Sequence, residues 1–159
     1  MAQFITPFLW LKDQAEEAAN FYVGIFPNSK VTSIQRFGDV GPGNPGTVLT
    51  AEFELNGFPF VALNGNEQST FTEATSFQID AKSQEEIDHY WDSLIADGGE
   101  ESMCGWLKDR FGVSWQVTPS VLPQLLGDPD PERAGRAMQA MMGMRKLIIA
   151  DLEKAANGE

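Results

Sequence analysis

Two stretches of this chain repeat one pattern, a short strand followed by a helix that starts with acidic residues. Setting EEAANFYVGIF (16 to 26) over EEIDHYWDSLI (85 to 95), an offset of 69 residues, superposes the acidic pairs and places Tyr22 on Trp91. Because amphipathic helices share a period, two unrelated helices could also match in this way. The elements around both helices follow one order as well, so the sequence favours a duplicated half-domain.

The first half predicts the element order β-α-β-β-β. Asp13, with Glu16 three residues later, has the pattern of a capping box and predicts the start of the helix. Asn56-Gly57 tolerates the positive φ angles of a tight hairpin turn. The predicted elements are a strand at 4 to 10, a helix to about residue 26, and strands at 31 to 37, 47 to 55 and 58 to 64.

The second half restarts the pattern after a polar linker at 65 to 75. Ser83 and Glu86 form a second capping box behind a strand at 76 to 81. The remaining strands are expected in the segments 101 to 107 and 113 to 119, joined by a turn at 109 to 112. We therefore expect one domain at 1 to 159, with module one at 1 to 64 and module two at 76 to 119.

The C-terminal extension, residues 120 to 159, has no counterpart in the first half. Asp130-Pro131 places an N-cap and a first-turn proline before one long helix at about 132 to 156. That helix either packs on its own domain or forms a partner surface, since methionine side chains adapt to irregular interfaces. Its apolar face would carry Ala137, Met141, Met144, Ile148 and Leu152.

Composition narrows the class of protein. The chain has 159 residues, a single cysteine and a formal net charge of -12. Such a charge repels phosphate backbones and anionic lipid, so nucleic acid is not an expected partner. No apolar stretch reaches the roughly 20 residues of a membrane-spanning helix, and the N-terminus lacks the features of a secretory signal. A cytoplasmic location is expected.

Three features could carry chemistry and are interpreted differently. The loop GPGNPG (41 to 46) matches the string of dinucleotide sites, but its prolines and the strand that follows predict a loop between strands instead. A mobile flap over a pocket is a better use for this loop than cofactor binding. His89 has no partner at metal spacing and is expected at the surface. Cys104 is expected to be a buried, inert thiol, and Lys108 nearby leaves it a weak catalytic candidate.

Alternation within the strands predicts the lining of a site. Gln78 and Gln116 lie opposite apolar residues on their strands, and Asn64 would share a face with Phe60. Converging polar faces would make a cavity with aromatic walls and neutral hydrogen-bonding groups, which is typical of a small-molecule site. A solvated outer sheet face is the competing interpretation. The expected pocket residues are Thr6, Phe8, Trp10, Phe60, Asn64, Ser76, Gln78, Cys104, Trp106 and Gln116.

Several runs together carry a family resemblance. They are TPFLW, EEAANFYVGIFPNSK, ALNG, SFQ, CGWLKDRFGVSWQ and TPSVLPQLLGDPDPERAGRAMQAM. They resemble the PhnB-like, or 3-demethylubiquinone-9 3-methyltransferase-like, branch of the vicinal oxygen chelate (glyoxalase/bleomycin resistance/extradiol dioxygenase) superfamily. The resemblance implies an α+β fold of paired βαβββ modules forming an open barrel around a cavity, plus a C-terminal helix, and a homodimer.

Metal-dependent relatives in this superfamily carry His or Glu in the first, fourth, fifth and eighth strands. The matching positions here are Thr6, Asn64, Ser76 and Gln116, the last because DRFGVSWQ resembles the family's turn before a ligand strand. Neutral hydroxyls and amides are poor ligands for divalent ions. We therefore expect no metal and no other cofactor.

The function expected from these residues is small-molecule binding without a metal ion. No glycine-rich methyl-donor site is found in the sequence, so methyltransferase activity is not expected. The alternative is a lyase or isomerase of the glyoxalase superfamily that uses an atypical metal site or Cys104.

Overall fold

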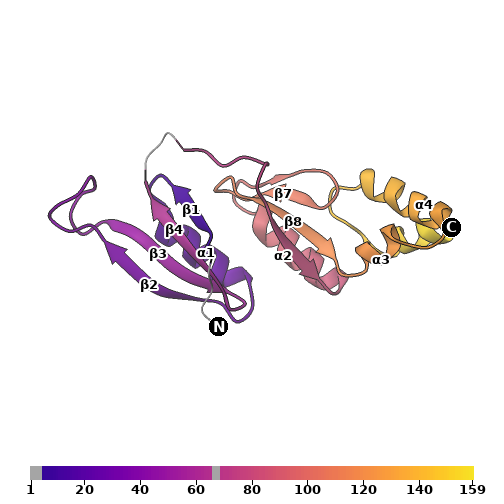
Figure 1. Ribbon diagram of the computed structural model, residues 1–159, viewed down its shortest axis with the longest axis horizontal. Helices are drawn as coiled ribbons and strands as arrows, with labels where there is room; N and C mark the ends of the chain where they lie inside the picture. The colour runs from indigo at the N-terminus through magenta and orange to yellow at the C-terminus, as the bar shows by residue number, and fades with distance from the viewer. Residues whose placement is uncertain (1–4, 66–68) are drawn as a thin grey trace. The chain divides into compact units, whose positions relative to one another are not determined.

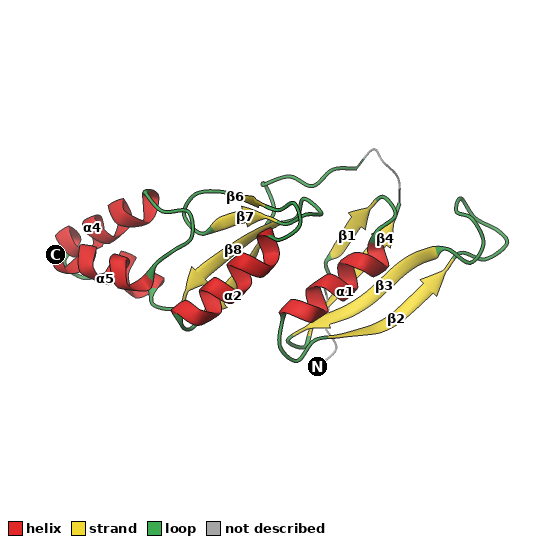
Figure 2. Ribbon diagram, turned by 180° about the vertical axis from the view of Figure 1, so that it is seen from behind, coloured by secondary structure: helices red, strands yellow, loops and turns green. Residues whose placement is uncertain are grey.

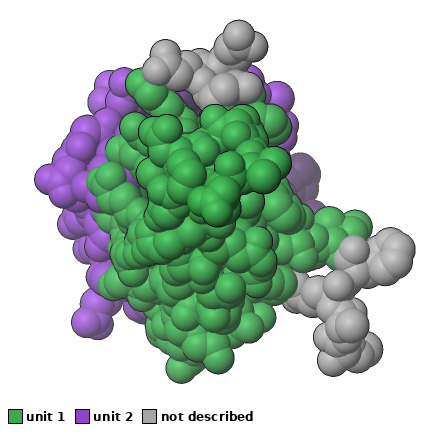
Figure 3. Space-filling model, turned by 90° about the vertical axis from the view of Figure 1, so that its left-hand side faces the viewer, with its two compact units in different colours: residues 1–70 green, residues 71–159 purple. Residues whose placement is uncertain are grey.

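The computed structural model describes residues 5–65 and 69–159 (Figure 1). The chain divides into two compact units, Met1–Thr70 and Phe71–Glu159, coloured separately in Figure 3. We call them the N-terminal and C-terminal units. Their boundary falls within the linker expected at 65 to 75, although residues 66 to 68, like Phe4 of the first predicted strand, lie outside the described residues.

The N-terminal unit has the predicted order β-α-β-β-β. Its sheet has the strand order β1-β4-β3-β2, with β1 parallel to β4 and the other pairs antiparallel. Helix α1 covers one face of this sheet (Figure 2). Asn56 and Gly57 have φ angles of 48° and 80°, which confirms the tight hairpin turn. The elements are β1 (Phe8–Leu11), α1 (Ala15–Ile25), β2 (Lys30–Arg36), β3 (Val48–Leu55) and β4 (Phe58–Asn64).

The C-terminal unit repeats this architecture. Its sheet has the order β5-β8-β7-β6, again with the outer pair β5 and β8 parallel. Tyr22 of α1 and Trp91 of α2 are both fully buried, as the predicted alignment of the two helices requires. The elements are β5 (Phe77–Ala81), α2 (Gln84–Ile95), β6 (Glu100–Glu101), β7 (Trp106–Lys108) and β8 (Ser114–Pro119). The α+β fold of paired βαβββ modules is thus confirmed.

Each sheet packs one face against its helix. In the N-terminal unit, Leu9, Ala51 and Phe53 are buried on that face, and the rings of Phe53 and Tyr22 lie 5.9 Å apart. We call the opposite side of each sheet its open face. Strand alternation therefore separates the residues that face the helix from those on the open face.

The start of α1 differs from the prediction. The N-cap residue is Gln14 and not Asp13, and its side chain makes no capping hydrogen bond. The backbone N–H of Ala15 donates instead to Oδ1 of Asn64, 2.8 Å away. The predicted capping box of α2 is confirmed for Ser83, whose Oγ accepts from the backbone N–H of Glu86.

The prediction of a single C-terminal helix at 132 to 156 is wrong. The extension forms α3 (Leu122–Leu126), α4 (Pro131–Met142) and α5 (Ile149–Asn157). Gly143 ends α4, and the next carbonyls are used elsewhere, since those of Met144 and Arg145 accept from the backbone N–H groups of Cys104 and Gly105 at 2.7 and 2.8 Å. Hydrogen bonds to a distant loop thus replace those of a continuous helix.

The extension has its own small core of Leu122, Leu147 and Leu152, against which Met141 and Met144 pack. Packing within the chain therefore accounts for much of the predicted methionine face. Within the described part of the chain, no helix has the length and apolar character needed to cross a membrane.

Candidate functional site

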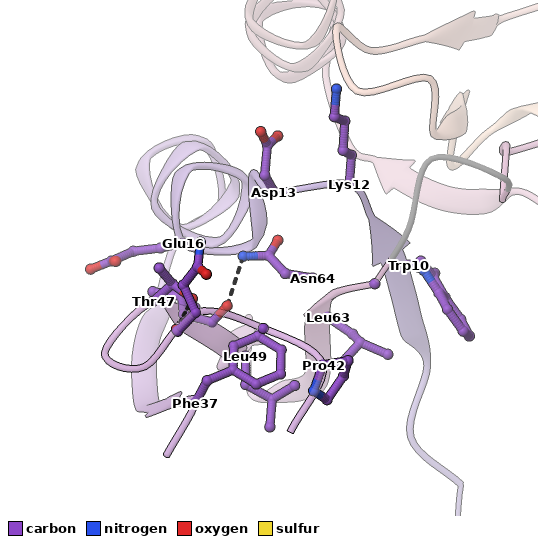
Figure 4. A pocket seen from close by; sticks show the side chains of 14 residues that line it. Trp10, Lys12, Asp13, Glu16, Phe37, Pro42, Thr47, Leu49, Leu63 and Asn64 are labelled. Atoms are coloured by element: carbon purple, nitrogen blue, oxygen red, sulfur yellow. Dashed lines mark hydrogen bonds between the residues drawn. The ribbon is translucent and has the colours of Figure 1, made fainter. Parts of the chain in front are cut away.

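The N-terminal unit contains a hollow of about 940 Å³, which we call the Trp10 cavity. Figure 4 shows apolar side chains gathered on one side of it, with Lys12 and Asp13 at the other. Such a combination of apolar walls and few polar groups is typical of a small-molecule site. The lining residues are Trp10, Lys12, Asp13, Glu16, Phe37, Pro42, Gly43, Asn44, Thr47, Val48, Leu49, Leu63, Asn64 and Gly65.

Trp10 owes its position to Gly65. The backbone N–H of Gly65 donates to the carbonyl of Leu11, 2.8 Å away, so the chain leaving β4 runs beside the end of β1. A Cβ atom on Gly65 would lie only 1.6 Å from Nε1 of Trp10. The absence of a side chain at this position therefore lets the indole, 43% exposed, lie against the backbone.

The GPGNPG loop forms another wall of the cavity. Its base is closed by two backbone hydrogen bonds of 2.8 Å, from Phe37 to the carbonyl of Thr47 and from Gly46 to the carbonyl of Phe37. A Cβ atom on Gly43 would lie 2.5 Å from the ring of Phe37. The loop joins β2 to β3, as predicted, and lines a pocket. Its movement as a flap stays a prediction.

Charged groups surround the cavity near the start of α1. Glu16 lies in the first turn of that helix, where a carboxylate favours the positive end of the helix dipole. Arg36 of β2 approaches it, with Nη2 3.6 Å from Oε2 of Glu16. Both side chains are substantially exposed, so this pair contributes little to stability.

Two of the predicted pocket residues lie on the helix side of the sheet. Phe60 is 5% exposed, and its ring stacks 5.5 Å from that of Phe53. Asn64 uses both ends of its amide within the unit, because Oδ1 accepts from Ala15 and Nδ2 donates to the carbonyl of Val48 at 3.0 Å. Asn64 borders the Trp10 cavity, yet neither residue shares the open face of Phe8 and Trp10. Phe60 and Asn64 share a face of β4, as expected, but the register turns that face toward α1.

The C-terminal unit brings four predicted residues together on its open face. Gln116 of β8 is in register with Gln78 of β5 and with Trp106 of β7. Its Nε2 donates to Oγ of Ser76 at 2.9 Å. The alternation within β5 and β8 therefore correctly predicted that polar side chains of these two strands are neighbours.

Cys104 lies apart from this row. It occupies the loop between β6 and β7 with a positive φ of 59°, and its side chain is partly buried. Its backbone is bound to Met144 rather than to a neighbouring strand. His89 is exposed on α2, as expected, and its ring lies 5.2 Å from that of Tyr90.

The donor groups do not fit the metal site that the superfamily implies. On the open face, β1 and β4 present apolar residues, and β5 and β8 present mainly amides and hydroxyls. Asp80 of β5 is a carboxylate there, and it accepts a 2.7 Å hydrogen bond from Oγ of Ser120. Across residues 5–65 and 69–159, no three His, Cys, Asp or Glu side chains gather in a group able to hold an ion.

Sequence analysis missed two carboxylates. Asp109 is 3% exposed, with Oδ1 accepting from the backbone N–H groups of Phe111 and Val113 and Oδ2 from Nε1 of Trp115. It organises the predicted turn before β8, and the D-x-x-G pattern was its signal. Glu52 of β3 lines a smaller hollow of about 350 Å³. Its place in the strand alternation, TVLTAEFEL, could have put it on the open face.

Comparison with known proteins agrees with this architecture. The model of the family described as 3-demethylubiquinone-9 3-methyltransferase matches residues 3–118. A solved structure from Bacillus cereus, a putative 3-demethylubiquinone-9 3-methyltransferase, PhnB protein, is 41% identical. The match covers 74% of this chain and 99% of that one, with a TM-score of 0.68. A search of curated proteins found no match.

More distant structures share the fold alone. Protein PA1353 from Pseudomonas aeruginosa is 20% identical with a TM-score of 0.63, and the match covers 74% of this chain and 98% of that one. The fosfomycin resistance protein FosX from Listeria monocytogenes is 16% identical with a TM-score of 0.51, over 75% of this chain and 93% of that one.

Two βαβββ units, each with one open sheet face, define a glyoxalase-like protein. The share of the chain that the matches cover and their sequence identity narrow this class to one family. The chain belongs to the 3-demethylubiquinone-9 3-methyltransferase, or PhnB-like, family of the vicinal oxygen chelate superfamily. The family model ends at residue 118, so α3, α4 and α5 lie beyond it.

Proposed function

We propose that this chain is a small-molecule-binding protein that works without a metal ion. The Trp10 cavity is the main observation behind this proposal, because about 940 Å³ is enough to accommodate a drug-sized molecule. The indole of Trp10 supplies a flat apolar surface, and aromatic pairs in such settings contribute about 0.5 to 1.5 kcal/mol beyond burial. The ligand is planar or amphipathic.

The other predicted residues divide into contacts and supports. Thr6, Phe8, Ser76, Gln78, Trp106 and Gln116 are retained as proposed ligand contacts, since they lie on open faces or line a hollow. Phe60 and Asn64 also border these hollows, but the Phe60 ring is engaged in packing and the Asn64 amide in capping α1, so both are assigned as supports. The proposal transfers no methyltransferase activity, since the GPGNPG loop joins two strands and does not open a helix that could receive a methyl donor.

Two variants of Trp10 test the binding proposal. A library of planar and amphipathic compounds is screened by native mass spectrometry, and saturable hits are measured by isothermal titration calorimetry. Trp10→Ala should weaken binding by at least about tenfold, since it removes a large contact surface, and Trp10→Phe should retain part of the affinity. Phe58→Ala is a matched control, because Phe58 is exposed to a similar degree, 45%, and does not line the cavity. Unchanged affinity in Trp10→Ala would count against the cavity as the site.

The expected assembly and location are also proposals. We propose a homodimer in the cytoplasm, on the strength of the family resemblance. Size-exclusion chromatography with light scattering tests the assembly, and a mass of 17.5 kDa at all concentrations would exclude the dimer.

A further inference from the structure

A second hollow, of about 350 Å³, opens on the sheet of the N-terminal unit, and we call it the Glu52 hollow. Its lining includes Thr6, Phe8, Thr32 and Glu52. They come from β1, β2, β3 and the segment before β1, so their positions are fixed mainly by the sheet and not by a loop tip. Such a frame can present polar groups at fixed spacing.

The strand register explains why Glu52 lies there. Glu52 of β3 is paired with Val61 of β4, and Val61 is paired with Phe8 of β1. The three residues thus form one row across the sheet. The pairing of β2 with β3 shifts between Val31 and Ser33, and this bulge leaves Thr32 outside the ladder and beside the hollow.

Glu52 differs from the neighbouring acid in its partners. Glu54 is paired with Lys30, with 3.7 Å between Oε2 and Nζ. In the part of the chain that the structure describes, the carboxylate of Glu52 has neither an ion pair nor a hydrogen bond, although its side chain is partly buried. A cation with N–H groups would supply this carboxylate with a partner.

The walls of the hollow match an organic cation. Phe8 is 61% exposed, and an aromatic face attracts an ammonium group within about 6 Å of its centroid. The hydroxyl groups of Thr6 and Thr32 can accept further N–H donors. A single uncommitted carboxylate is a poor set of ligands for Ca²⁺ or Mg²⁺, which take several oxygen ligands each.

We propose that the Glu52 hollow binds the ammonium group of an arylalkyl amine, an aliphatic amine that carries an aromatic ring, with Glu52 as its counter-ion and Phe8 as an aromatic wall. The inference rests on the proposed function and names the class of ligand. Phe8 and Trp10 are two residues apart on one face of β1, a separation of roughly 7 Å, so a single drug-sized ligand can reach both. The formal charge of -12 also draws cations toward the protein.

Two probes that differ only in charge test the proposal. Binding of 2-phenylethylamine, a cation at pH 7, and of its neutral isostere 2-phenylethanol is followed by two-dimensional NMR on the full-length protein. The amine should bind about tenfold more tightly than the alcohol, the difference that one charge-assisted hydrogen bond supplies. Titration with the amine should change the chemical shifts of the backbone amides of Phe8 and Glu52.

The variants are Glu52→Gln and, as a matched control in the same hollow, Glu54→Gln. Glu52→Gln should abolish the preference for the amine and leave the affinity of the alcohol unchanged, whereas Glu54→Gln should keep the preference. Equal binding of both probes to the unmodified protein, no saturable binding of the amine, or a preference that survives Glu52→Gln would overturn the inference. The proposed function fails separately, if Trp10→Ala leaves the affinity of every ligand found in the library screen unchanged.

Discussion

The last residue of β4, Asn64, caps the first residue of α1, since the backbone N–H of Ala15 donates to Oδ1 of Asn64 across 2.8 Å. The same side chain donates through Nδ2 to the carbonyl of Val48 at 3.0 Å. One amide therefore fixes the helix, the end of β4 and the start of β3 around the edge of the Trp10 cavity. Asn64, which was predicted as a ligand contact, thus holds the edge of the cavity in place.

Replacing Asn64 should destabilise the N-terminal unit. Asn64→Ala removes two partly buried hydrogen bonds, and we expect a loss of about 1 to 3 kcal/mol in the free energy of unfolding, measured by urea denaturation. Asn20→Ala is the control, because Asn20 makes an exposed hydrogen bond to Glu16 within the same helix. Equal effects of the two substitutions would contradict the capping role.

Asp109 should be among the residues least tolerant of change in the C-terminal unit. Asp109→Ala leaves the backbone N–H groups of Phe111 and Val113 and the indole N–H of Trp115 without their acceptor, at an expected cost of about 2 to 5 kcal/mol. Thermal denaturation measures the loss. A decrease no larger than that of the exposed Asp97→Ala would show that the buried carboxylate is dispensable.

Gln84 fastens the C-terminal extension to α2. Its Nε2 donates to the carbonyl of Leu147 at 3.2 Å, and its Oε1 accepts from the backbone N–H of Ile149 at 2.9 Å. Gln84→Ala should therefore speed hydrogen exchange at Cys104 and Gly105, whose N–H groups bind the same segment, by about tenfold. Gln139→Ala, on the exposed side of α4, is the control, and equal exchange rates in the two variants would refute the link.

This attachment should weaken in acid. The pKa of Asp88 lies below its ordinary value of 3.8, first because Nε2 of Gln84 donates to it and also because of Lys146, while burial opposes the shift. A carboxyl group with a lowered pKa in the folded state contributes stability that is fully present above its unfolded pKa and is lost as the pH falls through the folded value. After correction for the intrinsic pH dependence of amide exchange, the protection factor of Gly105 should fall below about pH 4, and fall less in Asp88→Asn, whose attachment no longer depends on this proton. A pH profile that is identical in both proteins would disprove the role of Asp88.

Much of the fold could be predicted from local patterns. Ile79 and Trp115 are buried where strand alternation puts them, and Gly57 takes the backbone angle that a hairpin requires. These outcomes depend on residues that are close in sequence. A duplicated pattern then predicts the strand order of one unit from that of the other.

The features that were not predicted depend on hydrogen bonds and strand pairs between residues distant in sequence. The carbonyls of Met144 and Arg145 accept hydrogen bonds from the backbone of residues 104 and 105. Helix propensity is a local quantity and does not include this competition for the carbonyls. Asn64 could face either side of the sheet until the register with Leu11 was known. The bulge at Thr32 likewise depends on pairing with β3. For these reasons the site was predicted only in part. Of the expected pocket residues, Trp10 and Asn64 line the Trp10 cavity, and the charged groups of Lys12, Asp13 and Glu16 beside them were not expected there.

Ligand mapping by NMR after removal of metal ions tests whether the Trp10 cavity binds a small molecule without a metal. The protein is treated with a chelator, dialysed, and titrated with the tightest ligand from the library screen. We expect saturable binding with the largest shifts at the indole N–H of Trp10 and the backbone N–H of Gly65, and an affinity that added Zn²⁺, Ni²⁺ or Mn²⁺ does not raise. Binding that appears only with a metal ion, or shifts that avoid Trp10 and Gly65, would contradict this expectation.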